Sequence, residues 1–200
     1  MKGNGKWIIL AIVAMVGLGT CSSYNGLVTL DQNVKGSWSE YQNQLKRRSD
    51  LIPNLVTTVK GYAEHERGIF DEVAEARAKV SQVVSIDPSK LANDPLLQKQ
   101  MMEMQKGLNA SLGRLIAIAE NYPQLKADKN FLRLQDELSG TENRVAVARG
   151  RAIKTTQEYN TSVLHAPTSV VARLGGFAVR EYYAAAESEQ AVPVVDFGKR

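Results

Sequence analysis

The sequence predicts an all-α protein: an elongated antiparallel bundle of three long helices and a short C-terminal helix, preceded by an N-terminal membrane anchor helix. Apolar residues recur at alternating steps of three and four over most of the chain, which is the spacing of amphipathic helices. No strand pattern of any length appears. Residues 7–18 are apolar on every face, which is typical of a membrane segment rather than of a bundle helix.

Length and composition indicate one globular domain behind the anchor. The chain has 200 residues, of which 44% are hydrophobic and 23% charged, as in an ordinary folded protein. Its net charge is +4, and Lys2 and Lys6 supply two of these charges, so the rest carries too small an excess to indicate nucleic acid binding. The single cysteine, Cys21, excludes an internal disulfide framework and a thiolate metal cage.

The N-terminal segment, taken as residues 1–30, has no charged residue between Lys6 and Asp31. At about 1.5 Å per residue, roughly two dozen residues in one helix cross a hydrocarbon core of about 30 Å. The strongly apolar part is shorter, like a signal-peptide core, and LGTC ending at Cys21 resembles a lipobox, except that Thr20 stands where glycine, alanine or serine is usual. Three interpretations stay open: an uncleaved anchor, a lipoprotein acylated at Cys21, and a soluble protein that packs this segment in its core.

Charges on either side of the apolar segment predict its orientation. Lys2 and Lys6 precede it, and the acidic Asp31 is the first charged residue after it. The positive-inside rule then keeps the short N-terminus in the cytoplasm and exports the rest of the chain. A lipoprotein would be exported as well, so both membrane interpretations place the domain on the same side.

The first bundle helix is predicted from Leu27 to Val84. Pro53 is its one irregularity, because proline inside a helix removes a hydrogen bond and costs about 3 kcal/mol or more unless the chain bends. Asp50 is suited to cap a restarted helix, but the apolar seam keeps its phase across the proline, which favours a kink at Asp50–Pro53 over a loop. The seam consists of Leu27, Leu30, Val34, Trp38, Tyr41, Leu45, Ile52, Leu55, Val59, Tyr62, Ile69, Val73, Ala76, Val80 and Val84.

A connection and a second helix follow. Pro88 and Pro95, set among serine, aspartate and asparagine, predict the connection. Asp94 then caps a helix whose first position is Pro95, and Tyr122 with Pro123 ends it. Its buried face is expected to contain Leu97, Met101, Met104, Leu108, Leu112, Leu115 and Ala119.

The third helix is predicted from about Asn130 to Val163, and a short turn before it allows an antiparallel return. Pro167 ends this segment, and SVVARL forms a short fourth helix closed by Gly175 and Gly176. The buried stripe of the third helix is expected to contain Phe131, Leu134, Leu138, Val145, Ala148, Ala152, Tyr159 and Val163.

These elements predict three parts of the chain. The anchor covers residues 1–30 and the helical bundle covers 31–176. The tail, 177–200, carries two apolar groups that are expected to dock it on the end of the bundle. These groups are Tyr182 with Tyr183, and Val192 with Val194, Val195 and Phe197.

Several separated motifs together resemble the LemA family of bacterial membrane-anchored helical proteins. They are YNGLVTLDQNVKGSWSEYQNQLKRRSDLIPNLVTTVKGYAEHE, ENYPQLKADKNFLRLQDELSGTENRVAVARGR and, more weakly, RLGGFAVREYY followed by VPVVDF. The resemblance runs from Tyr24 to about Phe197. It implies one N-terminal anchor in the bacterial cytoplasmic membrane, an elongated antiparallel bundle in the cell envelope, and no established enzymatic activity.

Histidine and carboxylate positions do not assemble a metal or catalytic site. His65 lies between Glu64 and Glu66, but a metalloprotease helix needs a second histidine four residues on, where Ile69 stands. His65 is expected on a helix surface. The chain also has no Ser–His–Asp arrangement, glycine-rich phosphate loop or CxxC pair, so we expect no catalysis, metal, cofactor or small-molecule substrate.

The basic run Lys46, Arg47 and Arg48 is followed by Asp50 and has no aromatic residue among it. A solvated helix face, or salt bridges to a neighbouring helix, accounts for this pattern. Contact with a phosphate or an anionic lipid headgroup is the alternative.

Other polar residues fall within the family motifs. Asn143 and Arg144 interrupt a strongly periodic helix, so we expect buried hydrogen bonds that fix helix register, with partner recognition as the alternative. The motif residues whose role the sequence leaves open are Trp38, Lys46, Arg47, Arg48, Asp50, Pro53, Asn54, His65, Glu66, Asn143 and Arg144.

Two functions fit these features. Long continuous seams without site chemistry favour a membrane-tethered structural or adaptor protein that binds an unidentified protein or a second copy of itself. The basic run supports the alternative, a lipid-binding or membrane-remodelling protein.

Overall fold

The computed structural model describes residues 4–181, and within them the chain is helical with no strand. This confirms the all-α class. The elements are α1 (Asn4–Lys60), α2 (Arg67–Val84), α3 (Pro88–Asn93), α4 (Pro95–Ile118), the 3-10 helix η1 (Ala119–Asn121), α5 (Pro123–Lys126), α6 (Lys129–Leu164) and α7 (Thr168–Gly175).

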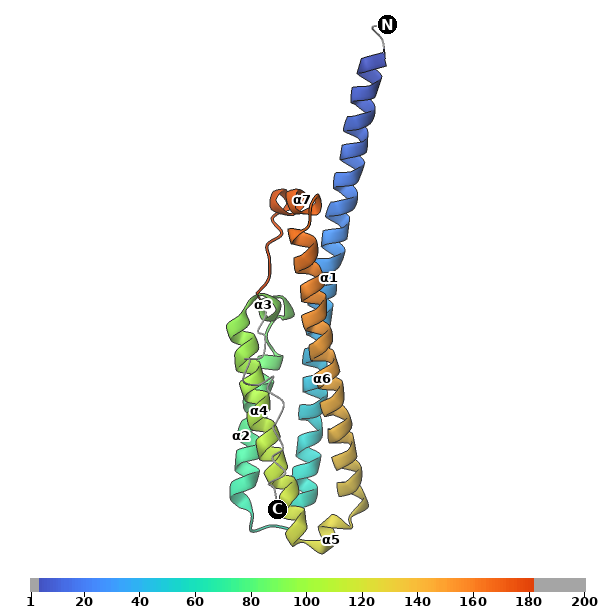
Figure 1. Ribbon diagram of the computed structural model, residues 1–200. Helices are drawn as coiled ribbons and strands as arrows, with labels where there is room; N and C mark the ends of the chain where they lie inside the picture. The colour runs from blue at the N-terminus through green and yellow to red at the C-terminus, as the bar shows by residue number, and fades with distance from the viewer. Residues whose placement is uncertain (1–3, 182–200) are drawn as a thin grey trace, which may run out of the picture.

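The helices form an elongated antiparallel bundle built from two pairs (Figure 1). α1 and α6 lie side by side over most of the length of the bundle, and α2 packs on α4. α2 and α3 also contact α1. α1 extends far beyond the other helices at its N-terminal end, and α7 lies at the end of α6 from which α1 leaves the bundle.

The single helix expected from Leu27 to Val84 is wrong: this stretch forms two helices, and the first begins upstream at Asn4. α1 therefore joins the anchor segment to the bundle without a break, and the bundle has four long helices rather than three. The break falls at residues 61–66, where Gly61 and the polar residues Glu64, His65 and Glu66 leave Ala63 as the buried residue of the turn.

Tyr62 was predicted to lie in the buried seam, but it falls in the break between α1 and α2. Its side chain is 38% exposed instead of buried, and its hydroxyl donates to the Asp128 carboxylate at 2.9 Å. The buried residue of the turn is Ala63, whose N–H donates to the carbonyl of Val59 at 2.9 Å. The chain can then reverse, so that α2 packs against both α1 and α4.

Capping side chains set most of the later boundaries. Asp94 accepts hydrogen bonds from the N–H groups of Leu96 and Leu97, and Pro95 is the first residue of α4, as predicted. The connection before it, expected to be irregular, contains the short helix α3, because the Asp87 carboxylate accepts from the N–H of Ser89 and starts another turn.

Two apolar clusters fill the bundle, one near the anchor and one at the distal end. The anchor-proximal cluster includes Leu27, Val34, Trp38, Tyr41, Leu45, Val83, Leu91, Met101, Val145, Ala152, Tyr159 and Ala172. The distal cluster includes Ile52, Leu55, Val59, Phe70, Val73, Leu108, Leu112, Leu115, Leu125, Phe131, Leu134 and Leu138. Buried polar side chains of α1, α4 and α6 lie between the two clusters, at about the level of Arg48; they include Arg48, Ser49, Gln105 and Thr141.

The first turn of α6 should make bundle stability depend on pH. Hydrogen bonds from the N–H of Phe131 and the hydroxyl of Tyr62 hold the pKa of Asp128 below its usual range. A depressed pKa gives stability that is present above the ordinary value, near 3.9, and is lost as the pH falls through the folded-state value. Asp128→Asn keeps a capping side chain but cannot titrate.

The expected result is that the wild-type protein is more stable than Asp128→Asn near neutral pH, and that this difference shrinks as the pH falls from about 5 through the folded-state pKa of Asp128, which lies below its usual range. Urea midpoints of the detergent-solubilised chains at each pH measure it. Tyr62→Phe removes one donor and should weaken the dependence. A difference that stays constant with pH would show that Asp128 does not act in this way.

Candidate functional site

The apolar N-terminal part of α1 is an extended exposed apolar surface of the described chain. Every residue from Lys6 to Ser22 is exposed, including Cys21. The segment is long and apolar enough to cross a membrane, and none of its most apolar stretch is buried against the bundle. Burial begins at Leu27, four residues before Asp31. The segment therefore does not pack in the protein core, which was one of the three interpretations of the sequence.

The basic run divides between surface and interior. Lys46 and Arg47 are exposed, while the Arg48 side chain is only 6% exposed and reaches Glu142 of α6, with 3.6 Å between Nη2 and Oε2. Burial lowers the pKa of the Arg48 guanidinium, and Glu142 partly opposes this. Arg48 Nε has no hydrogen-bond partner in the described structure. The run is thus a solvated face at two positions and an interhelical salt bridge at the third.

Pro53 lies inside α1 and the helix continues through it, so no restart occurs at Asp50. Proline has no N–H, so the carbonyl four residues earlier, that of Ser49, loses its helical donor. Arg77 of α2 replaces it, because its Nε donates to the Ser49 carbonyl at 3.0 Å. Arg77 therefore links α1 to α2 at the point where proline has removed a backbone hydrogen bond.

These contacts belong to one polar layer between the two apolar clusters. Glu142 also accepts from the amide of Asn109 at 3.0 Å, which joins α4 to α6. One turn or more toward the anchor, the Tyr41 hydroxyl donates to the Gln105 side-chain carbonyl at 3.0 Å, and burial raises the pKa of Tyr41 to about 12. The polar layer consists of the buried Arg48, Ser49 and Gln105 with Arg77, Asn109 and Glu142 at its edge, and Tyr41 of the anchor-proximal cluster donates to it. Such a layer favours one register of the four helices over others.

Trp38 and Asn54 have different surroundings. Trp38 is 3% exposed, its ring meets that of Tyr41 edge-on at 5.8 Å between centroids, and its Nε1 donates to the hydroxyl of Thr156 on α6 at 3.3 Å. Trp38 is therefore a core residue that joins α1 to α6. Asn54 is exposed beside Pro53 on the outer face of α1.

Asn143 and Arg144 correct the prediction of buried hydrogen bonds, because both side chains are exposed on α6. The buried stripe passes through Thr141 and Val145, which leaves the two intervening motif residues on the outer face. They line a shallow hollow between α1 and α6 together with Glu40, Gln44, Val147, Ala148 and Arg151. The alternative interpretation, partner recognition, agrees with this exposure.

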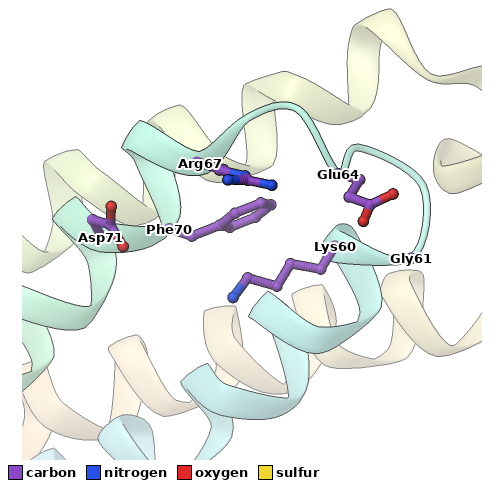
Figure 2. A pocket seen from close by; sticks show the side chains of 6 residues that line it. All are labelled: Lys60, Gly61, Glu64, Arg67, Phe70 and Asp71. Atoms are coloured by element: carbon purple, nitrogen blue, oxygen red, sulfur yellow. The ribbon is translucent and has the colours of Figure 1, made fainter.

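His65 and Glu66 lie in the loop between α1 and α2 and are exposed, so His65 is not on a helix surface as expected. Within residues 4–181 no cluster of three or more histidine, cysteine, aspartate or glutamate side chains is arranged to hold a metal ion. The same turn borders a hollow where the Lys60 ammonium lies 5.1 Å from the centroid of the Phe70 ring (Figure 2). Cations and carboxylates alternate around this hollow, so neither sign of charge dominates. Its lining residues are Lys60, Gly61, Glu64, Arg67, Phe70 and Asp71.

A second buried arginine, Arg180, was not predicted from the sequence. Its guanidinium pairs with Asp31 of α1 and lies 4.7 Å from the Tyr159 ring centroid, and its N–H and carbonyl bond the side chain of Asn160. The start of the predicted tail is thus attached to α1 and α6. The tail groups from Tyr182 onward lie outside the described residues.

Comparison with known proteins places this geometry in a family. The family model described as "LemA family" matches residues 37–197. These include all of the described bundle after residue 36 of α1. The chain belongs to the LemA family. The LemA match begins beside Trp38. It covers the polar layer and the exposed Asn143 and Arg144 of α6, whereas the apolar segment lies before it.

Two named groups of relatives support the LemA assignment. Magnetosome proteins MamQ 1 and MamQ 2 of Paramagnetospirillum magneticum are each 24% identical over 189 residues, covering 88% of this chain and 69% of theirs. Magnetosome protein MamQ of Magnetospirillum gryphiswaldense is 25% identical over the same shares. Protein LemA of Metamycoplasma hominis is 27% identical over 116 residues, which are 58% of this chain and 48% of that protein.

Proposed function

We propose that this LemA-family chain is a single-pass membrane adaptor that holds a rigid helical bundle on the exported face of the bacterial cytoplasmic membrane and binds a partner protein without catalysing a reaction. The observation that carries the proposal is the continuity of α1, which has 57 residues and passes from the exposed apolar segment into the bundle core. At 1.5 Å per residue it is about 85 Å long. A continuous helix would fix the height and direction of the bundle above the bilayer.

The exposed face of α6 beside α1 is the surface that we assign to the partner. Arg144 and Arg151 are exposed there, and Val147 between them is an apolar residue with 63% of its side chain exposed. Two cations around an apolar centre suit an acidic protein surface with an apolar contact of its own. Confinement to the membrane raises the effective concentration of such a partner, so weak contacts become sufficient.

A photo-crosslinking residue at Val147, in the full chain in its native host, tests the adaptor proposal. We expect an adduct of defined mass that Arg144→Glu reduces strongly, because the charge reversal repels an acidic partner. The same crosslinker at Leu132, a 45% exposed position nearer the distal end of α6, serves as the control. An adduct at twice the mass of the chain would identify self-association. No discrete adduct at Val147, or one that Arg144→Glu leaves unchanged, would contradict the proposal.

The basic run does not favour the second candidate function, lipid binding. Lys46 lies twenty positions beyond Gly26, about 30 Å along α1 from the expected membrane surface. At that distance an exposed lysine is beyond the screening length of the bilayer charge, which is about 8 Å at physiological salt. Arg48 is moreover buried and paired with Glu142 of α6.

For Cys21 we expect no lipid modification. α1 is helical through Leu18 and Cys21, and the Thr20 hydroxyl bonds the Val16 carbonyl at 2.8 Å, as in an ordinary membrane helix. The intact mass of the chain extracted from native membranes should therefore be that of the full, unmodified sequence, and Cys21→Ser should change it only by the substitution. A mass that lacks the first 20 residues and carries acyl chains, lost in Cys21→Ser, would show instead that the protein is a lipoprotein.

A further inference from the structure

The short helix α7 and the end of α6 expose an apolar face that the bundle does not cover. Leu174 is 83% exposed, Val170 61% and Leu164 67%. Val170 and Leu174 lie one turn apart, and at 100° per residue both are nearly opposite the fully buried Ala172. α7 is therefore amphipathic with its apolar side turned outward.

α7 is held against α1 at the point where α1 leaves the bundle. Phe177, just after α7, packs edge-on against Tyr24 of α1 with 5.5 Å between ring centroids. Gly175 fits beside both rings, and a Cβ added there would lie 2.9 Å from the Phe177 ring and 3.2 Å from that of Tyr24. Figure 1 shows α7 lying across the end of α6, on the side toward which the free part of α1 extends.

Aromatic residues on α1 indicate how deep this point lies in a membrane. Trp7 and Tyr24 are both exposed, at 75% and 44%; Trp7 begins the uncharged segment, and Tyr24 lies three positions before burial begins at Leu27. They are 17 positions apart, which is about 25 Å along a helix. Tryptophan and tyrosine collect at the two faces of a bilayer whose hydrocarbon core is about 30 Å thick. Tyr24 therefore lies at the exported interface of the membrane that α1 spans, and α7 lies at the same depth.

We propose that α7 is an interfacial helix that inserts Leu164, Val170 and Leu174 into the boundary between lipid headgroups and acyl chains, beside the point where α1 enters the membrane. The inference rests on the proposed membrane anchor. Arg173 and His165 are exposed next to the apolar face and are placed to reach lipid phosphates. Because α1 and α7 both attach the bundle to the membrane, its rotation about the α1 axis is fixed as well as its height above the bilayer.

Depth-dependent quenching in the full chain tests this contact. In a Cys21→Ser background, single cysteines at Val170 and Leu174 are labelled with an environment-sensitive fluorophore and reconstituted in vesicles of phosphatidylcholine and phosphatidylglycerol. A lipid with quenching groups along its acyl chain, which reach both the interface and the depth of Val13, is then added. Val13, 65% exposed within the anchor, is the positive control, and the 63% exposed Val147 and 45% exposed Leu132 on the bundle are the matched negative controls.

We expect labels at Val170 and Leu174 to lose fluorescence to the lipid quencher as the Val13 label does, while those at Val147 and Leu132 keep it. If Val13 is quenched but Val170 and Leu174 behave like Leu132, α7 is not in the interface, although the anchor is in place. If Val13 is not quenched, the N-terminal segment is not in the membrane, and this result contradicts both the membrane-adaptor proposal and the interfacial position of α7. Equal quenching at all five positions would mean that the whole bundle lies on the bilayer, which also contradicts the proposal.

Discussion

Replacing Trp38 with alanine is expected to lower the free energy of unfolding by about 3–5 kcal/mol, the usual cost of removing a large aromatic side chain from a packed core. Trp38 is 3% exposed and packs against Tyr41 within the anchor-proximal cluster. The loss should therefore come mainly from the cavity. Trp38→Phe leaves a smaller cavity and removes the hydrogen bond to Thr156, so it should cost less, about 1–2 kcal/mol.

Urea unfolding of the detergent-solubilised chain, followed by circular dichroism, measures this difference. The chain offers a matched control in Trp7→Ala, because Trp7 is 75% exposed in the anchor and contributes nothing to the bundle core. That variant should leave the unfolding midpoint unchanged. If Trp38→Ala behaved like Trp7→Ala, then Trp38 would not be a core residue and a role in partner binding would have to be considered instead.

Replacing Pro53 with alanine is expected to stabilise the bundle by about 1–3 kcal/mol, because it restores an N–H to a helix interior where proline is costly. Arg77→Leu should have the opposite effect. It leaves the Ser49 carbonyl without its donor, at a cost of about 1–3 kcal/mol. Lys79→Leu is the control, since Lys79 is exposed two residues away and pairs with Glu75 of the same helix, so its loss should cost about 0.5 kcal/mol or less.

The double variant separates this mechanism from general packing. With alanine at position 53, the backbone again donates to the Ser49 carbonyl, so Arg77→Leu should cost clearly less than it does beside proline. A double-mutant cycle from the four urea unfolding curves gives the coupling energy directly. If the two substitutions add within about 0.3 kcal/mol, the Arg77 guanidinium is not the replacement donor.

The class and many boundaries of this fold were predictable because they depend on local chemistry. The seam spacing required helices, Asp94 with Pro95 required a helix start, and Gly176 ends α7 with a φ of 75°, a conformation that glycine adopts at low cost. Each of these depends on residues within one or two turns of the chain. The exposed apolar helix at the N-terminus likewise followed from its own uncharged length.

The remaining features depend on long-range packing between helices. The seam continues in phase from Val59 to Tyr62, so periodicity alone offered no reason to end α1 at Lys60. The reversal there brings α2 onto α4, a contact between helices that the periodicity of one segment does not show. A proline at position 53 implies that the Ser49 carbonyl needs a donor, but the sequence does not show that this donor is Arg77.

Polar residues of the candidate site were harder still to place. Three consecutive basic residues look alike in the sequence, yet only Arg48 turns inward to Glu142. Asn143 and Arg144 were placed inside, although they fall between the buried Thr141 and Val145 and so belong to the outer face. A stricter count of the helical period of α6 would have placed Asn143 and Arg144 on the outer face. The burial of Arg48 could not be predicted in this way, because it depends on where α6 lies relative to α1.

The most direct test of the central claim is a distance across the membrane boundary of α1. Spin labels at Val16 in the anchor and Asn43 in the bundle, both exposed, are placed in the full-length Cys21→Ser chain in lipid nanodiscs. The positions are 27 residues apart, so one unbroken helix predicts a single narrow distribution of distances centred at about 40 Å by pulsed electron–electron double resonance. A broad distribution, or one centred well below that distance, would show that the anchor and the bundle are joined by a flexible or bent connection, and it would contradict a rigid membrane adaptor.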